Sequence, residues 1–146
     1  MADAGVAAQV QKRYVYHCPL RWSDMDAFQH VNNVVYLRYL EEARVDWMFN
    51  RAAAAGVGEF ESFGTVVARH EIAYKRPLVY RPEPVRVETW VTHLRHASFT
   101  LAYEVCDDAA VYAVASSVLV PYDLACGRPR RLSAIERDYL QEFYTP

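Results

Sequence analysis

The stretch from Val31 to about Ala54 contains neither proline nor glycine, and its apolar residues recur at helical spacing. The recurring positions are Val34, Leu37, Leu40, Ala43, Trp47 and Met48. At about 1.5 Å per residue, a helix of about 24 residues spans roughly 36 Å, enough to cross a small domain. Because its first turns are apolar almost all round and its charges gather later, we expect the amino-terminal half to be enclosed and the rest to reach the surface. The remaining chain must be arranged around this one helix.

Beyond Gly58 the apolar residues recur with a period of two, which is the spacing of strands that bury one face. These runs cover residues 64–75, 84–94, 97–106 and 110–122. An earlier strand is expected from Tyr14 to Trp22, irregular or at a sheet edge where Pro19 interrupts it. Short turns between successive strands imply antiparallel pairing.

The last segment carries Ser133 and Glu136 in the Ser-x-x-Glu spacing of a capping box, so a short terminal helix should begin there and continue to about Phe143. One early strand, one long helix and four later strands predict an α+β fold, with an antiparallel sheet wrapped around the central helix. No linker divides the chain. We therefore expect a single domain over residues 12–146, preceded by a flexible tail over residues 1–11.

Composition narrows the class of protein. The net charge of -2 argues against a nucleic-acid-binding protein, which would carry a basic surface. Hydrophobic residues form 53% and aromatic residues 14% of the chain, which suggests an apolar surface for a partner subunit. The three cysteines form no Cys-x-x-Cys pair, so we expect reduced thiols in a cytoplasmic protein and give them no metal or redox role. Without a basic leader or a run of about 18 apolar residues, neither export nor a membrane span is expected.

The lead-in to the long helix concentrates chemistry-bearing side chains. Between Arg21 and Asn33 lie two carboxylates, a histidine and two asparagines. A helix start offers free backbone N–H groups and a partial positive charge, which can stabilise a carbonyl oxygen that becomes negative. A carboxylate four to seven residues upstream, such as Asp26, could lie across the carbonyl carbon from those donors. This pairing is typical of acyl transfer.

Structural roles are the alternative for the same side chains. Aspartate is common before helices, so Asp24 is interpreted as a turn cap, and Asp26 could serve the same purpose. His30 and Asn32 could equally satisfy the free N–H groups of the helix start. Only the combination of these residues favours the catalytic interpretation.

The segment from Asp24 to Arg44, which begins Asp-x-Asp-Ala-Phe-Gln-His-Val-Asn-Asn, resembles the signature of the 4-hydroxybenzoyl-CoA thioesterase-like hotdog-fold family. Its Asp-x-x-x-His-Val-Asn-Asn form is similar to that of bacterial thioesterases acting on fatty acyl-CoA. Residues 72–78 resemble the family's strand and basic-proline turn, and residues 98–101 its later hairpin strand. The resemblance covers nearly all of residues 12–143 and implies a hotdog fold.

The resemblance implies that Asp26 is the catalytic carboxylate, acting as a nucleophile on the thioester or as a general base for water. The backbone N–H of Asn33 would bind the thioester oxygen. His30 and Asn32 would hold the loop and the attacking water. The family also implies a homodimer joined edge to edge, with the active sites at the interface, and often a homotetramer.

Substrate-binding residues are expected beside this centre. CoA carries several phosphates, and Lys75 and Arg76, which end a strand next to Pro77, are the preferred basic pair for them. The resemblance adds Ser98. Tyr36 could line the acyl pocket or belong to the ordinary core. CoA would be part of the substrate and product, so no cofactor and no metal are expected.

Other activities remain open or are disfavoured. Thioesters on acyl carrier protein would suit a basic rim as well as acyl-CoA does, and a non-catalytic acyl-CoA-binding protein is the rival from another class. The motifs of hotdog dehydratases and hydratases are not found. No Gly-x-Ser-x-Gly elbow is present, which disfavours a serine hydrolase, and the histidines lack metal-ligand spacing.

Overall fold

The computed structural model describes residues 12–57 and 64–146, so the tail expected over residues 1–11 lies outside the described residues. The helical elements are η1 (Trp22–Asp24), α1 (Asn33–Val45), η2 (Asp46–Arg51), α2 (Ala52–Ala54) and α4 (Ala134–Gln141). The strands are β1 (Tyr14–Cys18), β2 (Thr65–Tyr74), β3 (Val85–Leu94), β4 (Phe99–Cys106), β5 (Val111–Asp123) and β6 (Arg128–Pro129).

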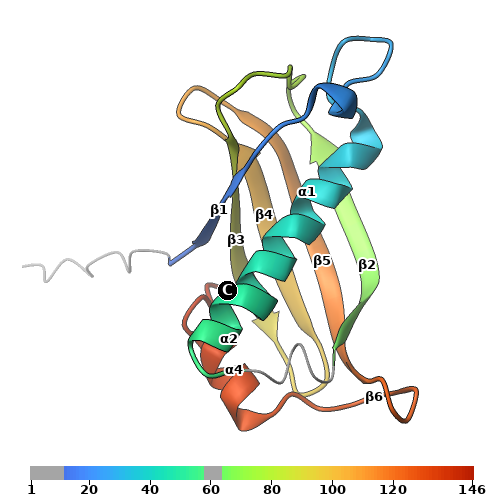
Figure 1. The fold of residues 1–146 in the computed structure, drawn as a ribbon. Coiled ribbons are helices and arrows are strands. Elements are labelled where there is room, and N and C mark those ends of the chain that lie inside the picture. The colour runs from blue at the N-terminus through green and yellow to red at the C-terminus, as the bar shows by residue number, and fades with distance from the viewer. Residues whose placement is uncertain (1–11, 58–63) are drawn as a thin grey trace, which may run out of the picture.

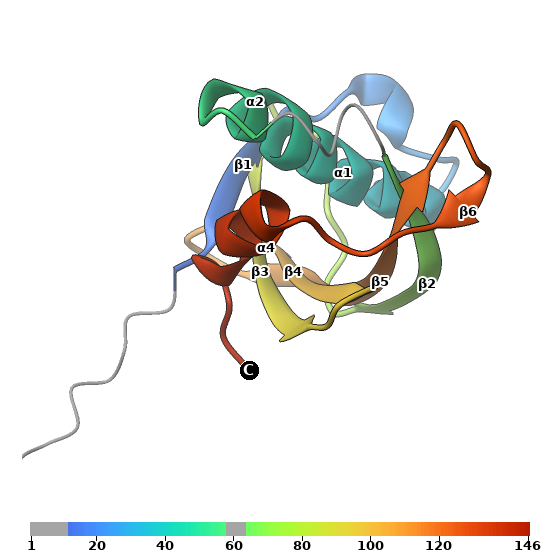
Figure 2. The same cartoon turned by 90° about the horizontal axis from the view of Figure 1, so that it is seen from below.

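The strands form one antiparallel sheet that curls around the long helix, as Figures 1 and 2 show. Its order is β1-β3-β4-β5-β2, with the short β6 paired to β5. Strands β3, β4 and β5 follow one another in both sequence and space, whereas β2 crosses over to pair with β5. The predicted hotdog fold is therefore confirmed, with β1 and β2 as its edges.

Alternation along the central strands separates a buried face from an outer one. In β3 every second residue from Val85 to Val91 is buried against the helix side, while the residues between them are partly exposed. The same alternation runs through Phe99, Leu101, Tyr103 and Val105 of β4. This period-two pattern is the one seen in the sequence, and it produces the concave apolar surface that holds the helix.

The long helix continues from α1 through the π-helical η2 into α2, close to the expected range. The expectation that its amino-terminal half is enclosed and the rest exposed is wrong for this chain. Val34 in the first turn is 67% exposed, whereas Trp47, more than three turns later, is fully buried. One stripe of the helix packs on the sheet along its whole length. None of the helices in the described residues is long and apolar enough to span a membrane.

Two terminal elements differ in how well they were predicted. Strand β1 ends at Cys18 instead of Trp22, because Pro19 has no N–H for a ladder hydrogen bond and the chain then turns into η1. The terminal helix α4 begins at the expected capping box, in which Ser133 Oγ accepts the Glu136 N–H at 3.1 Å. Glu136 is fully buried and pairs with the Arg130 guanidinium at 2.5 Å, so its charge is compensated.

Candidate active site

The long helix begins with a cap that ties it to the preceding loop. Asn32 occupies the N-cap position, and its Oδ1 accepts the Val34 N–H at 2.9 Å. The other end of the same amide, Nδ2, donates to Oδ2 of Asp26 at 3.0 Å. One side chain therefore joins the helix start to the candidate carboxylate, which confirms the capping role considered for Asn32.

Two donors hold the Asp26 carboxylate within a narrow turn. Its Oδ1 accepts the Phe28 N–H at 2.8 Å, and Oδ2 accepts the Asn32 amide. The turn closes through the Asp26 N–H, which donates to the His30 carbonyl at 3.1 Å. Gln29 reverses the chain with a φ of 64°, in the left-handed region. Because both oxygens accept hydrogen bonds, the arrangement suits an ionised carboxylate with a fixed direction.

Two neighbouring pockets open at this end of the molecule, and His30 lines both. The larger, of about 570 Å³, contains Asp26. The smaller, of about 320 Å³, is lined by Asn33, Tyr36, Lys75 and Arg76 among others. With Asn32 bonded to Asp26, the structure brings together every predicted site residue except Ser98.

The first helical residue offers an open backbone donor beside the carboxylate loop. The Asn33 N–H donates to no acceptor within residues 12–57 and 64–146. Its carbonyl accepts the Tyr74 hydroxyl at 2.8 Å, which fixes the first turn against the end of β2. A free N–H at the positive end of a helix can stabilise an oxygen that gains negative charge.

Tyr36 is both a core residue and a wall of the smaller pocket. It is buried in the main core and meets the Tyr74 ring edge-on, with 5.2 Å between ring centroids. Burial raises the pKa of Tyr36 to about 12, so its phenol is neutral at physiological pH.

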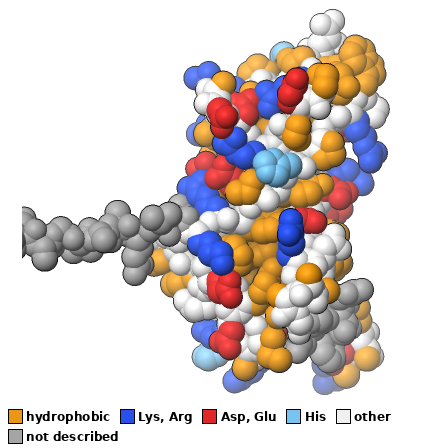
Figure 3. Space-filling view, turned by 60° about the vertical axis from the view of Figure 1, so that its left-hand side comes forward, with side chains coloured by type: hydrophobic (Ala, Val, Ile, Leu, Met, Phe, Trp, Pro, Cys, Tyr) orange, Lys and Arg blue, Asp and Glu red, His pale blue; other side chains and the backbone are white. Residues whose placement is uncertain are grey.

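Apolar side chains around Asp26 were missed by the sequence reasoning. Trp22 and Phe28 are 72% and 82% exposed, and Val79 and Tyr80 lie opposite them in the same pocket. Figure 3 shows hydrophobic side chains gathered at this end of the molecule. Phe28 lies within the motif and Trp22 two residues before it, so aromatic residues within a polar loop were the available signal.

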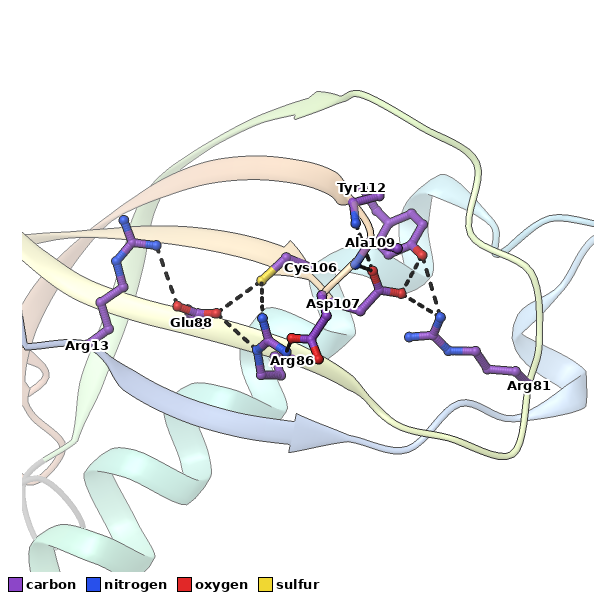
Figure 4. Close-up of polar contacts among 10 residues, drawn as sticks. Arg13, Arg81, Arg86, Glu88, Cys106, Asp107, Ala109 and Tyr112 are labelled. Carbon is purple, nitrogen blue, oxygen red and sulfur yellow. Dashed lines mark hydrogen bonds and ion pairs between the residues drawn. The ribbon is translucent and has the colours of Figure 1, made fainter.

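The loop between β2 and β3 supplies walls to both pockets, and a polar network holds it in place (Figure 4). The N–H groups of Lys75 and Arg76 donate to the Tyr112 carbonyl at 2.8 and 3.1 Å. Asp107 Oδ2 accepts the Tyr112 hydroxyl at 2.6 Å and the Arg81 guanidinium at 2.5 Å. The hydrogen bond from Tyr112, followed by that from Arg81, holds the pKa of Asp107 well below its usual range. The turn between β4 and β5 thereby braces the loop between β2 and β3.

Ser98 lies at the other end of the sheet. It lines a separate pocket of about 390 Å³ on the outer face, together with Arg69, His93 and Arg95. Its neighbour Phe99 pairs with Leu119 of β5, which in turn pairs with Val67 near the start of β2. The candidate site lies at the opposite end of β2. Within one chain, Ser98 therefore does not contribute to the pockets around Asp26.

Asp24 has the structural role assigned to it. Its Oδ2 accepts the Arg21 N–H at 2.9 Å and the Tyr39 hydroxyl at 2.6 Å. These bonds cap η1 and fasten the loop to α1, so the interpretation of Asp24 as a turn cap is confirmed. No group of three metal-ligating side chains gathers in the part of the chain that the structure describes.

A family profile and two solved structures all indicate a similarity between this chain and thioesterases. Residues 20–142 match the profile of the thioesterase-like superfamily. A candidate thioesterase of Pseudomonas aeruginosa is 32% identical, covers 84% of this chain and 94% of its own, and superposes with a TM-score of 0.72. A Thermus thermophilus thioesterase, solved with coenzyme A and zinc, is 29% identical over 88% of this chain and 92% of its own, with a TM-score of 0.72.

A thioesterase-superfamily structure from Jannaschia sp. reaches a TM-score of 0.81 at 20% identity, covering 92% of this chain and 94% of its own. At that identity the likeness concerns the fold alone. No curated protein matches this sequence.

Proposed function

Since this chain belongs to the thioesterase-like superfamily, we propose that it is an acyl-CoA thioesterase that hydrolyses a fatty or aromatic acyl-CoA to free acid and CoA. The observation that carries the proposal is the pairing of a held carboxylate with an open helix start. Asp26 is fixed by Phe28 and Asn32, and the Asn33 N–H, at the first turn of α1, has no acceptor among the described residues. Acyl transfer needs both components.

The proposed reaction begins with the thioester carbonyl oxygen at the Asn33 N–H. Asp26 then acts in one of two ways. As a nucleophile, its oxygen bonds to the carbonyl carbon, the carbon–sulfur bond breaks, CoA leaves as the thiolate, and water hydrolyses the resulting anhydride. As a general base, Asp26 accepts a proton from the water that attacks the same carbon; the carbon–sulfur bond then breaks, and CoA leaves as the thiol once its sulfur takes up that proton. In both routes the tetrahedral intermediate carries a negative oxygen, and the helix start would stabilise this oxygen.

His30 lies where the two pockets meet, so in this proposal it positions the attacking water or the loop. Lys75 and Arg76 would bind phosphates of CoA from the rim of the smaller pocket. The exposed aromatic residues Trp22 and Phe28 would contact the acyl group or the pantetheine arm. The coenzyme A in the Thermus thermophilus relative supports CoA as the carrier.

Dimerisation is part of the proposal. Strand β2 is a ten-residue edge, and it exposes Val66 and Val67 at 40% and 41%. Antiparallel pairing of β2 with a second copy would bring the end of one β2 beside the start of the other. The Ser98 pocket of one subunit would then approach the Asp26 pockets of its partner, which gives Ser98 a role in binding CoA. A homotetramer would require a further contact between such dimers.

The three cysteines, Cys18, Cys106 and Cys126, are all free, which supports a reducing location such as the cytoplasm. Burial raises the pKa of the Cys18 thiol to about 12 and keeps it protonated and unreactive.

An acyl-CoA panel with short, long and aromatic chains, followed by thiol release, tests the proposal. Asp26→Asn should lower turnover by about 100-fold or more while the protein remains folded. Asp138→Asn is the matched control, because Asp138 is exposed on α4 and far along the chain from the site. Absence of turnover by the wild type on every acyl-CoA, with turnover of acyl carrier protein thioesters, would change the carrier. Absence of both would leave a binding protein, and full activity of Asp26→Asn would exclude the proposed mechanism.

A further inference from the structure

A largely buried cation, the side chain of Arg44, lies midway along the helix. Arg44 is only 9% exposed, and it packs between α1 and the sheet. Its Nη1 donates to the Tyr103 hydroxyl at 3.2 Å. No carboxylate among the described residues forms an ion pair with it. A guanidinium has five N–H donors and is always charged, and the Arg44 nitrogens that donate to no protein atom reach solvent, so these donors are available to a ligand.

The neighbouring polar groups do not supply the missing charge. Burial raises the pKa of Tyr103, so its hydroxyl stays protonated. Behind it, Ser117 Oγ lies 2.7 Å from Nδ1 of His70, and desolvation together with Arg44 lowers the pKa of that histidine. The group is therefore neutral phenol, hydroxyl and imidazole around one cation. A cation surrounded by neutral groups attracts an anion, so a ligand that brings a carboxylate to this guanidinium would be favoured.

A pocket opens directly onto Arg44. It has a volume of about 200 Å³. It lies between the helix on one side and the start of β2 and the end of β5 on the other. Its walls are largely apolar, provided by Val45, Phe49, Val67 and Leu119. Glu41 also lines it, but this side chain is exposed to solvent, where water screens its charge. Within one chain, the pocket is separate from the two that surround Asp26.

We propose that this pocket binds a small organic carboxylate, with the carboxylate on the Arg44 guanidinium and the apolar part between Phe49, Val67 and Leu119. A planar guanidinium matches a carboxylate through two parallel hydrogen bonds. The apolar walls favour an organic anion over inorganic phosphate, because they would leave phosphate oxygens without donors. The pocket faces the helix, whereas pairing through β2 uses its backbone edge. The site does not depend on the proposed thioesterase activity.

Sodium benzoate is the probe, benzamide its neutral isostere, and inorganic phosphate the anion without an apolar part. Calorimetric titration of the wild-type protein should show benzoate bound at least about 10-fold more tightly than either control, as expected for a charge-assisted bidentate contact. Arg44→Met should lose benzoate affinity by roughly 10- to 100-fold. Arg38→Met is the matched control, because Arg38 is an exposed cation on the same helix that does not line this pocket, so benzoate binding should be unchanged.

A measurement on the wild type keeps the inference testable if Arg44→Met does not fold. In a nitrogen-15 spectrum, benzoate should shift the Arg44 Nε–H signal and the amides of Val45 and Phe49, whereas benzamide should not. Equal binding of benzoate and benzamide, stronger binding of phosphate, or shifts confined to the Asp26 pockets would each overturn the assignment. Loss of benzoate binding in Arg38→Met would do so as well.

Discussion

Replacement of Asn32 by serine or alanine separates the two hydrogen bonds that this side chain makes. Serine can still cap the helix by accepting the Val34 N–H, but it lacks the amide that donates to Asp26. Alanine loses both interactions. The two variants should therefore differ in stability and agree in their loss of activity.

The magnitudes follow from the geometry. An N-cap contributes about 1 kcal/mol, so Asn32→Ala should unfold with a free energy about 1 kcal/mol lower than Asn32→Ser. A hydrogen bond to a charged group contributes roughly 1.5–3 kcal/mol. If that bond orients Asp26 for reaction, both variants should lose roughly 10- to 100-fold in kcat/KM, at about 1.4 kcal/mol per tenfold.

Urea unfolding at equal protein concentration measures the first difference, since association would shift apparent stability. Thiol release from the best acyl-CoA of the panel measures the second. Wild-type kcat/KM in Asn32→Ser would refute the claim that the amide positions Asp26. Equal stability of the two variants would refute the capping role.

Three further predictions concern stability and are measured by urea unfolding. The lowered pKa of Asp107 means that its ionised form stabilises the fold fully above about pH 4 and progressively less as the pH falls; Asp107→Asn should therefore weaken this acid dependence, and an unchanged pH profile would contradict the role of its network. Leu40→Ala, at a fully buried position, should cost about 2–5 kcal/mol, whereas Val34→Ala in the exposed first turn should cost about 0.5 kcal/mol or less; equal costs would be inconsistent with the packing described. Ser133→Ala should cost about 1 kcal/mol by removing the cap of α4, and an unaltered free energy would show that this cap is dispensable.

Local sequence patterns predicted the elements well because periodicity is a local property. The strands containing Val85 and Phe99 alternate as half-buried strands must, and Ser133 marked the start of α4 within one residue. Pairing is not local. Tyr74 of β2 lies opposite Ala113 of β5. This pairing depends on where the chain returns to the sheet after the helix, and no pattern within β2 predicts it.

Burial along the helix was mispredicted for a related reason. An apolar residue such as Val34 indicates that a surface is suited to contact, but it does not say which chain provides that contact. In this chain alone Val34 is exposed, whereas the stripe through Leu40 and Trp47 meets the sheet.

One part of the candidate site is local in sequence and was predictable, and the other part comes from a distant segment and was not. Asp26, His30, Asn32 and Asn33 fall within one short segment, so spacing alone could group them. The opposite wall, which includes Tyr80, comes from a loop about fifty residues later, held by the β4–β5 turn through Asp107. Contacts of that kind follow from sheet topology and are not visible in the sequence.

The most direct test of the account is a crystal structure of the protein with a non-hydrolysable acyl-CoA analogue in which a methylene replaces the thioester sulfur. The carbonyl oxygen should lie about 3 Å from the Asn33 N–H and the carbonyl carbon should face Asp26, since oxyanion donors act at that range. An analogue bound with its carbonyl away from both Asn33 and Asp26 would contradict the assignment of this helix start as the catalytic centre.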